Sequence, residues 1–313
     1  MPGPVIAIGE CLVDLIAPGG VDLTVANELR IREGGAPANV AVALARLDVL
    51  SQMRAVLGDD PFGERLRSRL NREGVDVSTI RFADGIPTTV AFAWSDERGN
   101  GRFRIHRNAD ALLSPDDVTR ESLNGAAAIV VGSVAMCAEP SKSAILSALR
   151  HALDLGVPVV ADLNIRPGPG VPLDELRIIA AALVSSATVV KLSVDDSREL
   201  WGATSIREAS TELDRFDPAI AVITDGGRGA ALRASGRLVE LDVFPVEAIE
   251  PTGAGDAFTA AFISRMLAKD WAGADVDDLR FAMAAGALAT TEPGAMDGLP
   301  TRERIEDFLQ LHA

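Results

Sequence analysis

The chemistry open to this chain is most visible in residues 250–258, which read Glu-Pro-Thr-Gly-Ala-Gly-Asp-Ala-Phe. Residues 238–246, just before this run, are rich in Val, Leu and Phe and predict a strand. Large apolar side chains then recur at helical spacing, at Phe258, Phe262, Ile263, Met266 and Leu267. This spacing predicts a helix with one buried face. Two glycines and a carboxylate would therefore lie between the end of a strand and the start of a helix.

Gly253, Ala254 and Gly255 could close around an anion, because small residues leave their main-chain N–H groups accessible. N–H groups at the start of a helix favour a phosphate or a phosphoryl transition state. Asp256, in the first turn, would repel that anion unless it accepts the proton of an attacking hydroxyl group. We expect it to be ionised at neutral pH, since its unperturbed pKa is about 3.9 and a helix N-terminus favours the anion. The alternative is a glycine-rich helix start whose Asp only caps the helix.

A second glycine-rich helix start occupies residues 34–41. Pro37 suits the first helical turn, where no N–H donor is needed. Gly34 and Gly35 allow close approach of the main chain, and Asn39 offers both a donor and an acceptor. The pattern suits a neutral ligand that carries hydroxyl groups, although packing alone explains an isolated motif of this kind equally well.

Short uncharged runs recur along the chain, as expected for strands buried on both faces of a parallel sheet. The clearest are residues 5–8, 128–131, 157–161, 188–192 and 220–224. Helical apolar stripes separate them, at Val40, Ala43, Leu44 and Leu47 and at Ile145, Leu149 and Leu153. This alternation predicts a three-layer α/β domain with a mostly parallel central sheet.

Residues 88–111 break this alternation of strands and helices. Large apolar residues alternate with smaller ones at 89–94, a predicted turn follows at 96–101, and an alternating pattern resumes at 102–107. This pattern predicts a β-hairpin. Residues 12–31 also carry strand-like pieces, so the two insertions could pair into a small sheet over the main domain. The alternative is a hairpin that only lengthens the central sheet. Arginines in the hairpin favour a substrate lid, although arginine on an edge strand also opposes aggregation.

The bulk properties exclude several classes of protein. A net charge of −15 over 313 residues argues against nucleic acid or an anionic membrane surface as a partner. Cys11 and Cys137 are the only cysteines, which suits a reducing, cytoplasmic location. The N-terminus lacks the features of a signal peptide, and no apolar run approaches the roughly 20 residues that span a bilayer. The sequence also lacks a Gly-x4-Gly-Lys-Ser/Thr run and a complete Gly-x-Gly-x-x-Gly after the first strand, which argues against P-loop and Rossmann nucleotide sites.

Residues 34–41 and 250–258, in this order, resemble the two signatures of the PfkB, or ribokinase-like, family of sugar and nucleoside kinases. The resemblance implies one kinase domain over residues 1–313, with lid insertions at about 12–32 and 86–110. It implies that Asp256 is the catalytic base and that Gly253, Ala254 and Gly255 bind the transferring phosphoryl group. It also implies a sugar site that includes Asp14, Gly34, Gly35 and Asn39, with Glu10 as the competing candidate for the role of Asp14.

Residues 162–166 match the family pattern Asp-x-Asn-x-Arg. They follow a predicted strand, and ligands of open α/β sheets bind beyond the carboxyl ends of strands. If the chain stays extended here, its side chains alternate between two faces, and those of Asp162, Asn164 and Arg166 would lie on the same face. The resemblance implies that Arg166 reaches the phosphoryl group and that Asn164 contacts substrate, whereas a surface ion pair is the alternative.

Residues 191–196 depart from the family, which usually has Asn and Glu where Ser193 and Asp196 stand here. Oxygen ligands still suit Mg²⁺, so we expect Asp196 to hold the ion through water, with Asp195 as a second candidate. Lys191 and Ser193 are expected to contact ATP.

Further ATP contacts follow from the resemblance of residues 224–229 and 281–288 to the family's nucleotide site. They are Thr224, Gly226, Gly227, Gly229, Ala254, Gly255, Met283 and Gly286. Glu250 stands where many relatives have an Asp that helps to form a monovalent-cation loop. Glu250 and Thr252 therefore leave activation by K⁺ open.

We therefore expect an ATP- and Mg²⁺-dependent sugar kinase. Residues 107–113 and 294–301 resemble fructokinase-type members, which implies fructose as the acceptor. Phe103, Arg104 and Arg107 of the lid would also contact the sugar. Arginines could instead hold the carboxylate of 2-keto-3-deoxygluconate, so a kinase for that sugar acid is the nearest alternative. A ribokinase, a nucleoside kinase and a catalytically silent sugar sensor are the others. The apolar face at Val90, Phe92 and Trp94 suggests a homodimer formed through the lid.

Overall fold

The computed structural model describes residues 3–18, 21–95, 101–166 and 171–312. Its centre is an eight-stranded sheet in the order β14-β13-β12-β11-β10-β9-β1-β4. The six neighbouring strands β12, β11, β10, β9, β1 and β4 pair in parallel, and β13 and β14 add an antiparallel edge. Their bounds are β1 Val5–Ile8, β4 Ser51–Arg54, β9 Ala128–Gly132, β10 Val159–Asp162, β11 Val189–Ser193, β12 Ile220–Thr224, β13 Ala230–Ala234 and β14 Arg237–Leu241.

The five sheet strands predicted from uncharged runs are confirmed, with β1 and β12 at the predicted bounds. Both faces of the sheet are buried, as those runs indicated. In β1, Val5 and Ala7 belong to one apolar cluster, whereas Ile6 and Ile8 belong to the other. Successive side chains of a strand point to opposite faces, so a run without polar residues serves a sheet that is covered on both sides.

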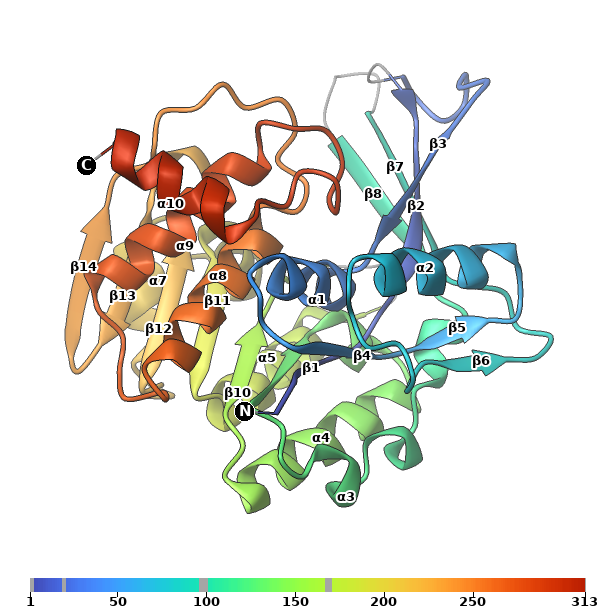
Figure 1. The fold of residues 1–313 in the computed structure, drawn as a ribbon, viewed down its shortest axis with the longest axis horizontal. Coiled ribbons are helices and arrows are strands. Elements are labelled where there is room, and N and C mark those ends of the chain that lie inside the picture. Colours follow the sequence, from blue (N-terminus) through green and yellow to red (C-terminus); the bar gives the residue numbers. More distant parts are fainter. Residues whose placement is uncertain (1–2, 19–20, 96–100, 167–170, 313) are drawn as a thin grey trace.

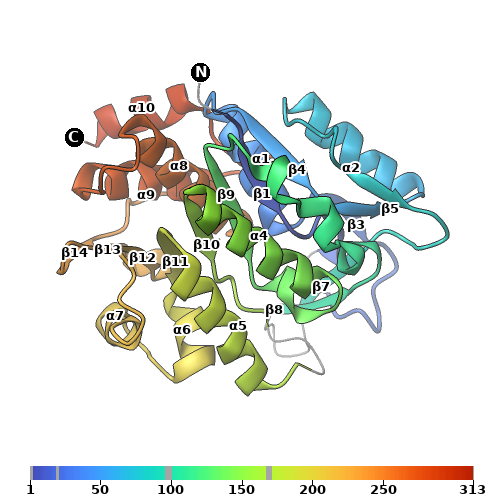
Figure 2. The same cartoon turned by 90° about the horizontal axis from the view of Figure 1, so that it is seen from below.

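Helices cover the two faces of the sheet in separate layers (Figures 1 and 2). One layer contains α1 (Ala36–Arg46), α8 (Ala254–Ala268), α9 (Val276–Ala289) and α10 (Arg302–Leu311). The other contains α4 (Ser141–Leu155), α5 (Leu173–Ser186), α6 (Val194–Trp201) and α7 (Ile206–Leu213). The remaining helices are α2 (Pro61–Arg72) and the short α3 (Arg120–Leu123). This three-layer α/β arrangement is the predicted fold class.

A second, four-stranded sheet stands away from the main layers, at the upper right of Figure 1. Its order is β3-β2-β7-β8. The strands are β2 (Leu12–Ile16), β3 (Arg30–Gly34), β7 (Val90–Ser95) and β8 (Gly101–His106). Both predicted strand-rich insertions therefore pair with each other, through β2 and β7, and the hairpin does not extend the central sheet. A separate two-stranded sheet joins β5 (Val56–Gly58) to β6 (Arg81–Ala83).

Three local predictions differ from the structure or lie outside it. The strand predicted over residues 238–246 ends at Leu241, and the chain from 242 to 253 has no helix or strand. Pro245 cannot donate to a sheet ladder, and the apolar residues around it line a cavity instead. Leu153, assigned to the buried stripe of α4, is exposed. The predicted hairpin turn at 96–101 falls, except for Gly101, outside the described residues.

No helix in the described ranges is both long and apolar enough to cross a membrane.

The start of α1 depends on a glycine that no other residue can replace without strain. Gly35, the N-cap, has φ +101°, and a Cβ there would lie 2.6 Å from the carbonyl oxygen of Glu10. Gly74 also has a positive φ, +84°, but has open space around it. Gly35→Ala therefore adds a clash to the strain that both positions share.

We predict that Gly74→Ala lowers the free energy of unfolding by about 1–2 kcal/mol, and that Gly35→Ala lowers it by about 1–3 kcal/mol more. Equilibrium urea unfolding of the two variants measures both losses. Equal losses would contradict the assignment of a close contact at Gly35.

Candidate active site

The carboxyl ends of the parallel strands meet at one edge of the central sheet, and the predicted site residues gather there. The start of α8 divides this edge into two regions. On one side lies a cavity of about 420 Å³, lined in part by Ala254 and Gly255. On the other side, Asp256 faces the start of α1, where the Asn39 amide donates a hydrogen bond of 2.8 Å to Asp256 Oδ2. The two predicted glycine-rich helix starts are therefore in direct contact.

The first turn of α8 offers main-chain donors to an anion. Gly253 is the N-cap with φ +86°, and a Cβ there would lie 2.5 Å from the Ala295 carbonyl oxygen. The N–H of Ala254 already donates to Pro251 O, and the N–H of Ala257 donates to Gly253 O. Among the described residues, the N–H groups of Gly255 and Asp256 have no such partner. The expected anion site therefore shifts by one residue, away from Ala254 and toward Asp256.

A buried ion pair lies directly beneath this turn. Lys191 Nζ, on β11, is 3.0 Å from Asp162 Oδ1 at the end of β10, and Thr259 Oγ1 of α8 donates to Asp162 Oδ2 at 3.0 Å. A Cβ on Gly255 would lie 3.1 Å from Lys191 Nζ, so glycine lets the helix rest on the ammonium group. Burial opposes the charge of Lys191, but Asp162, Asp196 and Asp256 together hold its pKa above the ordinary value.

Burial also changes the expected charge of the candidate base. Desolvation, followed by the repulsion of Asp162, raises the pKa of Asp256 to about 7, although the Asn39 hydrogen bond and the charges of Lys191 and Arg166 lower it. The expectation that Asp256 is already ionised at neutral pH was therefore wrong in extent, because a pKa of about 7 leaves about half of this carboxyl group protonated there. The helix N-terminus favours the anion, but removal of water outweighs it here.

Asp14, on β2, lies against the glycine pair that precedes α1. A Cβ on Gly34 would lie 2.2 Å from Asp14 Oδ2, so this glycine makes room for the carboxyl group. Desolvation, with repulsion from Glu250, raises the pKa of Asp14 to about 7. The structure thus brings Asp14, Gly34, Gly35, Asn39 and Asp256 together, as the sequence predicted.

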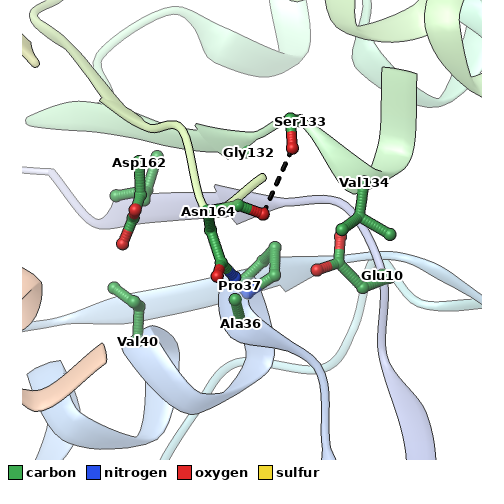
Figure 3. A pocket seen from close by; sticks show the side chains of 10 residues that line it. Glu10, Ala36, Pro37, Val40, Gly132, Ser133, Val134, Asp162 and Asn164 are labelled. Carbon is green, nitrogen blue, oxygen red and sulfur yellow. Dashed lines mark hydrogen bonds between the residues drawn. The ribbon is translucent and has the colours of Figure 1, made fainter. Parts of the chain in front are cut away.

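Glu10 is a third acidic residue in this region. Its carboxyl group is buried, and Glu10 Oε2 has no hydrogen-bond partner in the described part of the chain. Desolvation raises its pKa to about 7 against the opposing charge of Arg107. Figure 3 shows Glu10, next to Val134, and Asp162 on opposite sides of Asn164. All four residues line a cavity of about 10 Å³, roughly the space of one water molecule.

Asn164 does not follow the predicted strand alternation. β10 ends at Asp162, and Asn164 has φ +36°, with its carbonyl oxygen held by Ser133 Oγ at 3.3 Å (Figure 3). As a result Asp162 is buried, Asn164 lines the small cavity, and Arg166 is exposed. Arg166 still acts electrostatically on Asp256, whose pKa it lowers.

The larger cavity collects most of the predicted ATP contacts. Eight of the ten line it: Thr224, Gly226, Gly227, Gly229, Ala254, Gly255, Met283 and Gly286. The glycine loop is closed by a hydrogen bond of 2.8 Å from Asp225 N to Gly229 O. Lys191 and Ser193 do not line it. The chain after β14 forms another wall that the sequence did not predict, with Val243, Phe244, Pro245, Val246 and Ala248.

Ser193 and Asp196 form a helix cap rather than an open metal site. Ser193 Oγ and N both donate to Asp196 Oδ2 at 2.8 Å, and Ile165 N donates to Asp196 Oδ1 at 2.7 Å. This is a capping box, which the spacing of the two residues could have revealed. Three of the four acceptor positions of Asp196 are therefore occupied, and the remaining one could accept a hydrogen bond from a metal-bound water. Asp195 is mostly exposed and paired with Arg198.

The described residues contain no cluster of three or more His, Cys, Asp or Glu side chains suited to a metal ion. Glu250 accepts a hydrogen bond of 3.1 Å from Gly294 N, which fixes the loop before α8 to the turn at 294–298. Thr252 is exposed.

The small sheet contradicts part of the predicted sugar site. Paired residues of neighbouring strands share a face, so Asp14, Ala91 and Ile105 lie on one face. Phe103 also lies on that face, whereas Arg104, paired with Phe92, lies on the other. Arg107 follows β8, and its guanidinium is occupied by Asp110, Val134 O and Ser141. Arg104 therefore lies on the face opposite Asp14, whereas Arg107 is held by its ion pair close to Glu10, whose pKa its charge lowers.

Sequence and structure comparisons identify similar proteins over the full length of the chain. The family model described as "pfkB family carbohydrate kinase" matches residues 4–302. The chain is 33% identical to a fructokinase of Klebsiella pneumoniae over 99% of this chain and all of that protein. It is 32% identical to fructokinase-1 of Zea mays, covering 98% of this chain and 97% of that one. A crystal structure of Vibrio cholerae fructokinase with fructose, ADP and calcium superposes with a TM-score of 0.87, at 31% identity, over 98% of this chain and 99% of that one.

The raised pKa of Asp256 predicts a pH-dependent effect on stability. In the folded protein this carboxyl group keeps its proton up to about pH 7, whereas the ordinary value is 3.8. Raising the pH from 5 to 8 therefore favours the unfolded chain through this group. Asn carries no such proton, so the Asp256→Asn variant should not lose stability in this way. Between pH 5 and pH 8, its free energy of unfolding should therefore rise by about 1–3 kcal/mol relative to that of the native protein.

Denaturant titrations at the two pH values measure this gain. Asp154→Asn, at an exposed position of α4, serves as the control and should change by less than about 0.5 kcal/mol at either pH. A constant difference between Asp256→Asn and the native protein would contradict the raised pKa.

Proposed function

The chain belongs to the pfkB family of carbohydrate kinases, and on that premise we propose that it transfers the γ-phosphoryl group of MgATP to a primary hydroxyl group of fructose. Asp256 is the catalytic base in this proposal. One observation carries it. Asp256 directly follows Gly255, which lines the large cavity, and its carboxyl group accepts a hydrogen bond from Asn39 at the start of α1.

The reaction assigns a separate task to each side of α8. As the sugar oxygen attacks the γ-phosphorus, its proton passes to an Asp256 carboxylate oxygen, the new O–P bond forms, and the bond to the ADP oxygen breaks. The N–H groups of Gly255 and Asp256, with Arg166, would stabilise charge on the transferring group. Phosphoryl transfer has a loose transition state, so positioning and electrostatic stabilisation supply most of the rate.

The residues around the nucleotide cavity fit a Mg²⁺ ion that is held mainly by phosphate oxygens and water. Such binding is usual for this ion, and the open acceptor position of Asp196 would receive a bound water. When present, Mg²⁺ neutralises phosphate charge. The Lys191–Asp162 pair is nearly neutral as a unit, so it supports α8 without competing strongly for that ion.

The buried carboxyl groups around the start of α1 favour a neutral sugar over a sugar acid. Glu10, Asp14 and Asp256 each lie next to part of residues 34–39, and hydroxyl groups can donate to and accept from carboxyl groups. With pKa values of about 7 these groups are partly ionised at neutral pH, and their ionised forms would repel a substrate carboxylate. The arginines that would have held it are occupied or on the other face, as Arg107 and Arg104 are. These features favour fructose over 2-keto-3-deoxygluconate, in agreement with the activity named for the similar proteins.

A coupled assay of ADP release tests the acceptor, with MgATP and a panel of fructose, 2-keto-3-deoxygluconate, ribose and adenosine. We predict that fructose gives the highest kcat/KM. Turnover restricted to 2-keto-3-deoxygluconate would reassign the cleft to a sugar acid. Binding of fructose by calorimetry without turnover of any acceptor would instead support a sugar sensor.

The mechanism also predicts a pH profile. A base with a pKa of about 7 is inactive when protonated, so kcat/KM for the sugar should fall about tenfold for each unit below pH 7. In the Asp256→Asn variant, kcat should fall by a factor of about 10²–10⁴, while the variant still binds ADP. Calorimetry of ADP binding is the control for folding. Near-normal turnover of this variant, or a flat profile from pH 5 to 8, would exclude Asp256 as the base.

A further inference from the structure

Arg32, in the small sheet, begins beside Asp14 but ends at a carboxylate from another part of the chain. We propose that Asp297 is a specificity-determining residue, which holds the Arg32 guanidinium away from the phosphoryl acceptor and so favours a neutral sugar over an anionic one. This role of Asp297 rests on the proposed kinase function and concerns the charge of the acceptor that the same site takes.

Strand pairing places Arg32 next to Asp14. Arg32 of β3 is the residue directly opposite Asp14 of β2 in an antiparallel pair. Opposite residues share a face of the sheet, with Cβ atoms about 4.5–5.5 Å apart, and an arginine side chain is long enough to span that separation. Arg30 lies on the same face but opposite Ile16, farther from Gly34. Arg32 is therefore the arginine of β3 that could reach a ligand bound at Asp14.

The guanidinium of Arg32 lies instead at Asp297, in the turn at 294–298. Arg32 Nη1 is 3.3 Å from Asp297 Oδ2, and Arg69 Nη2 of α2 donates to Asp297 Oδ1 at 2.7 Å. Burial and repulsion from Glu250 raise the pKa of Asp14 to about 7. A guanidinium within about 4–6 Å of a carboxyl group would lower its pKa, so the raised pKa agrees with an arginine that is drawn away from Asp14.

The turn fixes Asp297 independently of Arg32. Gly298 N donates to Gly294 O at 3.0 Å, and Gly294 N donates to Glu250 Oε2 at 3.1 Å. A Cβ on Gly294, which has φ +99°, would lie 3.2 Å from Asp297 Oδ2, so this glycine makes room for the carboxylate. Asp297 is thus a fixed partner to which the longer side chain of Arg32 extends.

Loss of the Asp297 carboxylate would release Arg32 in particular. Arg46 Nε and Nη2 donate to Glu73 at 2.8 and 2.9 Å, and Arg69 Nη2 is 3.0 Å from Glu73 Oε1. These two arginines therefore keep a carboxylate partner without Asp297. Within the described ranges, Arg32 forms its ion pair with Asp297 and with no other carboxylate, so it would keep none.

A released guanidinium beside Asp14 would change the charge that the site accepts. Arginine binds carboxylates through parallel hydrogen bonds, so a free Arg32 would attract the carboxylate of a sugar acid. While Arg32 is held, the buried carboxyl groups around the start of α1 repel such a ligand in their ionised forms. Specificity here combines repulsion of the wrong ligand with the removal of a group that would bind it.

Calorimetry of the native protein and of Asp297→Ala tests this role, with 2-keto-3-deoxygluconate and fructose as ligands. In the variant, the Kd of the sugar acid should fall by about tenfold or more, the worth of one hydrogen bond to a charged group. The Kd of fructose should change by less than about threefold. An unchanged Kd for the sugar acid would overturn the proposal, whether or not fructose is phosphorylated. Absence of turnover with every acceptor would count against the proposed function alone.

Two further variants identify the group that is responsible. Asp297→Ala combined with Arg32→Met should lose the gained affinity, because the released guanidinium is then missing. Glu73→Ala, the matched control, removes the other carboxylate of the same cluster and leaves Arg32 paired, so the ratio of the two Kd values should stay within about threefold. A gain that persists without Arg32, or that Glu73→Ala also shows, would overturn the proposal.

Thermal unfolding shows whether each variant folds, and Arg32→Met alone decides the matter if Asp297→Ala does not. Because Arg32 is held away from the acceptor, this variant should keep the KM for fructose within about threefold of the native value. A rise above about tenfold would indicate that the guanidinium contacts the sugar in the native protein, and would overturn the proposal.

Discussion

The buried ion pair between Lys191 and Asp162 is the interaction on which the site depends most directly. It joins Asp162, the last residue of β10, to Lys191 in the middle of β11, and Thr259 attaches α8 to it one turn after Asp256. Two buried charges are costly to desolvate, and removal of one leaves the other unpaired. Burial is the main cause of the raised pKa of Asp256, and the pair modifies that pKa, since Asp162 raises it and Lys191 lowers it. The pair therefore influences both the position of α8 and the acidity of Asp256. Because Gly255 lies against the ammonium group, the glycine of the motif is required by the pair as well as by an anion.

The layers and the meeting of the two glycine-rich helix starts could be predicted from sequence, because both follow from local patterns. Uncharged runs predicted the positions of the strands, and parallel strands place their carboxyl ends at the same edge of the sheet. The partners of Asp162 could not be predicted in this way. Lys191 and Thr259 lie 29 and 97 residues away along the chain, and no local spacing connects them. The capping box of Ser193 and Asp196 was readable from spacing, but the resemblance to a metal motif directed attention away from it.

The small sheet shows why side-chain direction was harder to predict than strand position. The alternation in residues 102–107 identified β8 correctly. Which face meets the cleft depends on register with β7 and β2, and a shift of one residue exchanges the faces. Phe103 therefore shares a face with Asp14, and Arg104 does not. Arg107 lies beyond the strand, where Asp110 holds it. Composition alone suggested a basic lid, whereas pairing leaves an apolar and acidic surface over the cleft.

The two sides of α8 thus differ in the kind of recognition that they permit. On the side of Asp256 and Asp14 the carboxyl groups are buried, and this burial is the main cause of their raised pKa values. A ligand with several hydroxyl donors would replace the missing water, and an analogue that lacks one would leave a buried acceptor unpaired, which is a strong basis for selection. The cavity beyond Gly255 has few such groups, since Thr224 and Thr290 alone among its lining residues carry a side-chain oxygen or nitrogen. In the proposed reaction, selection by hydrogen bonds would therefore act mainly on the acceptor side of α8, next to Asp256.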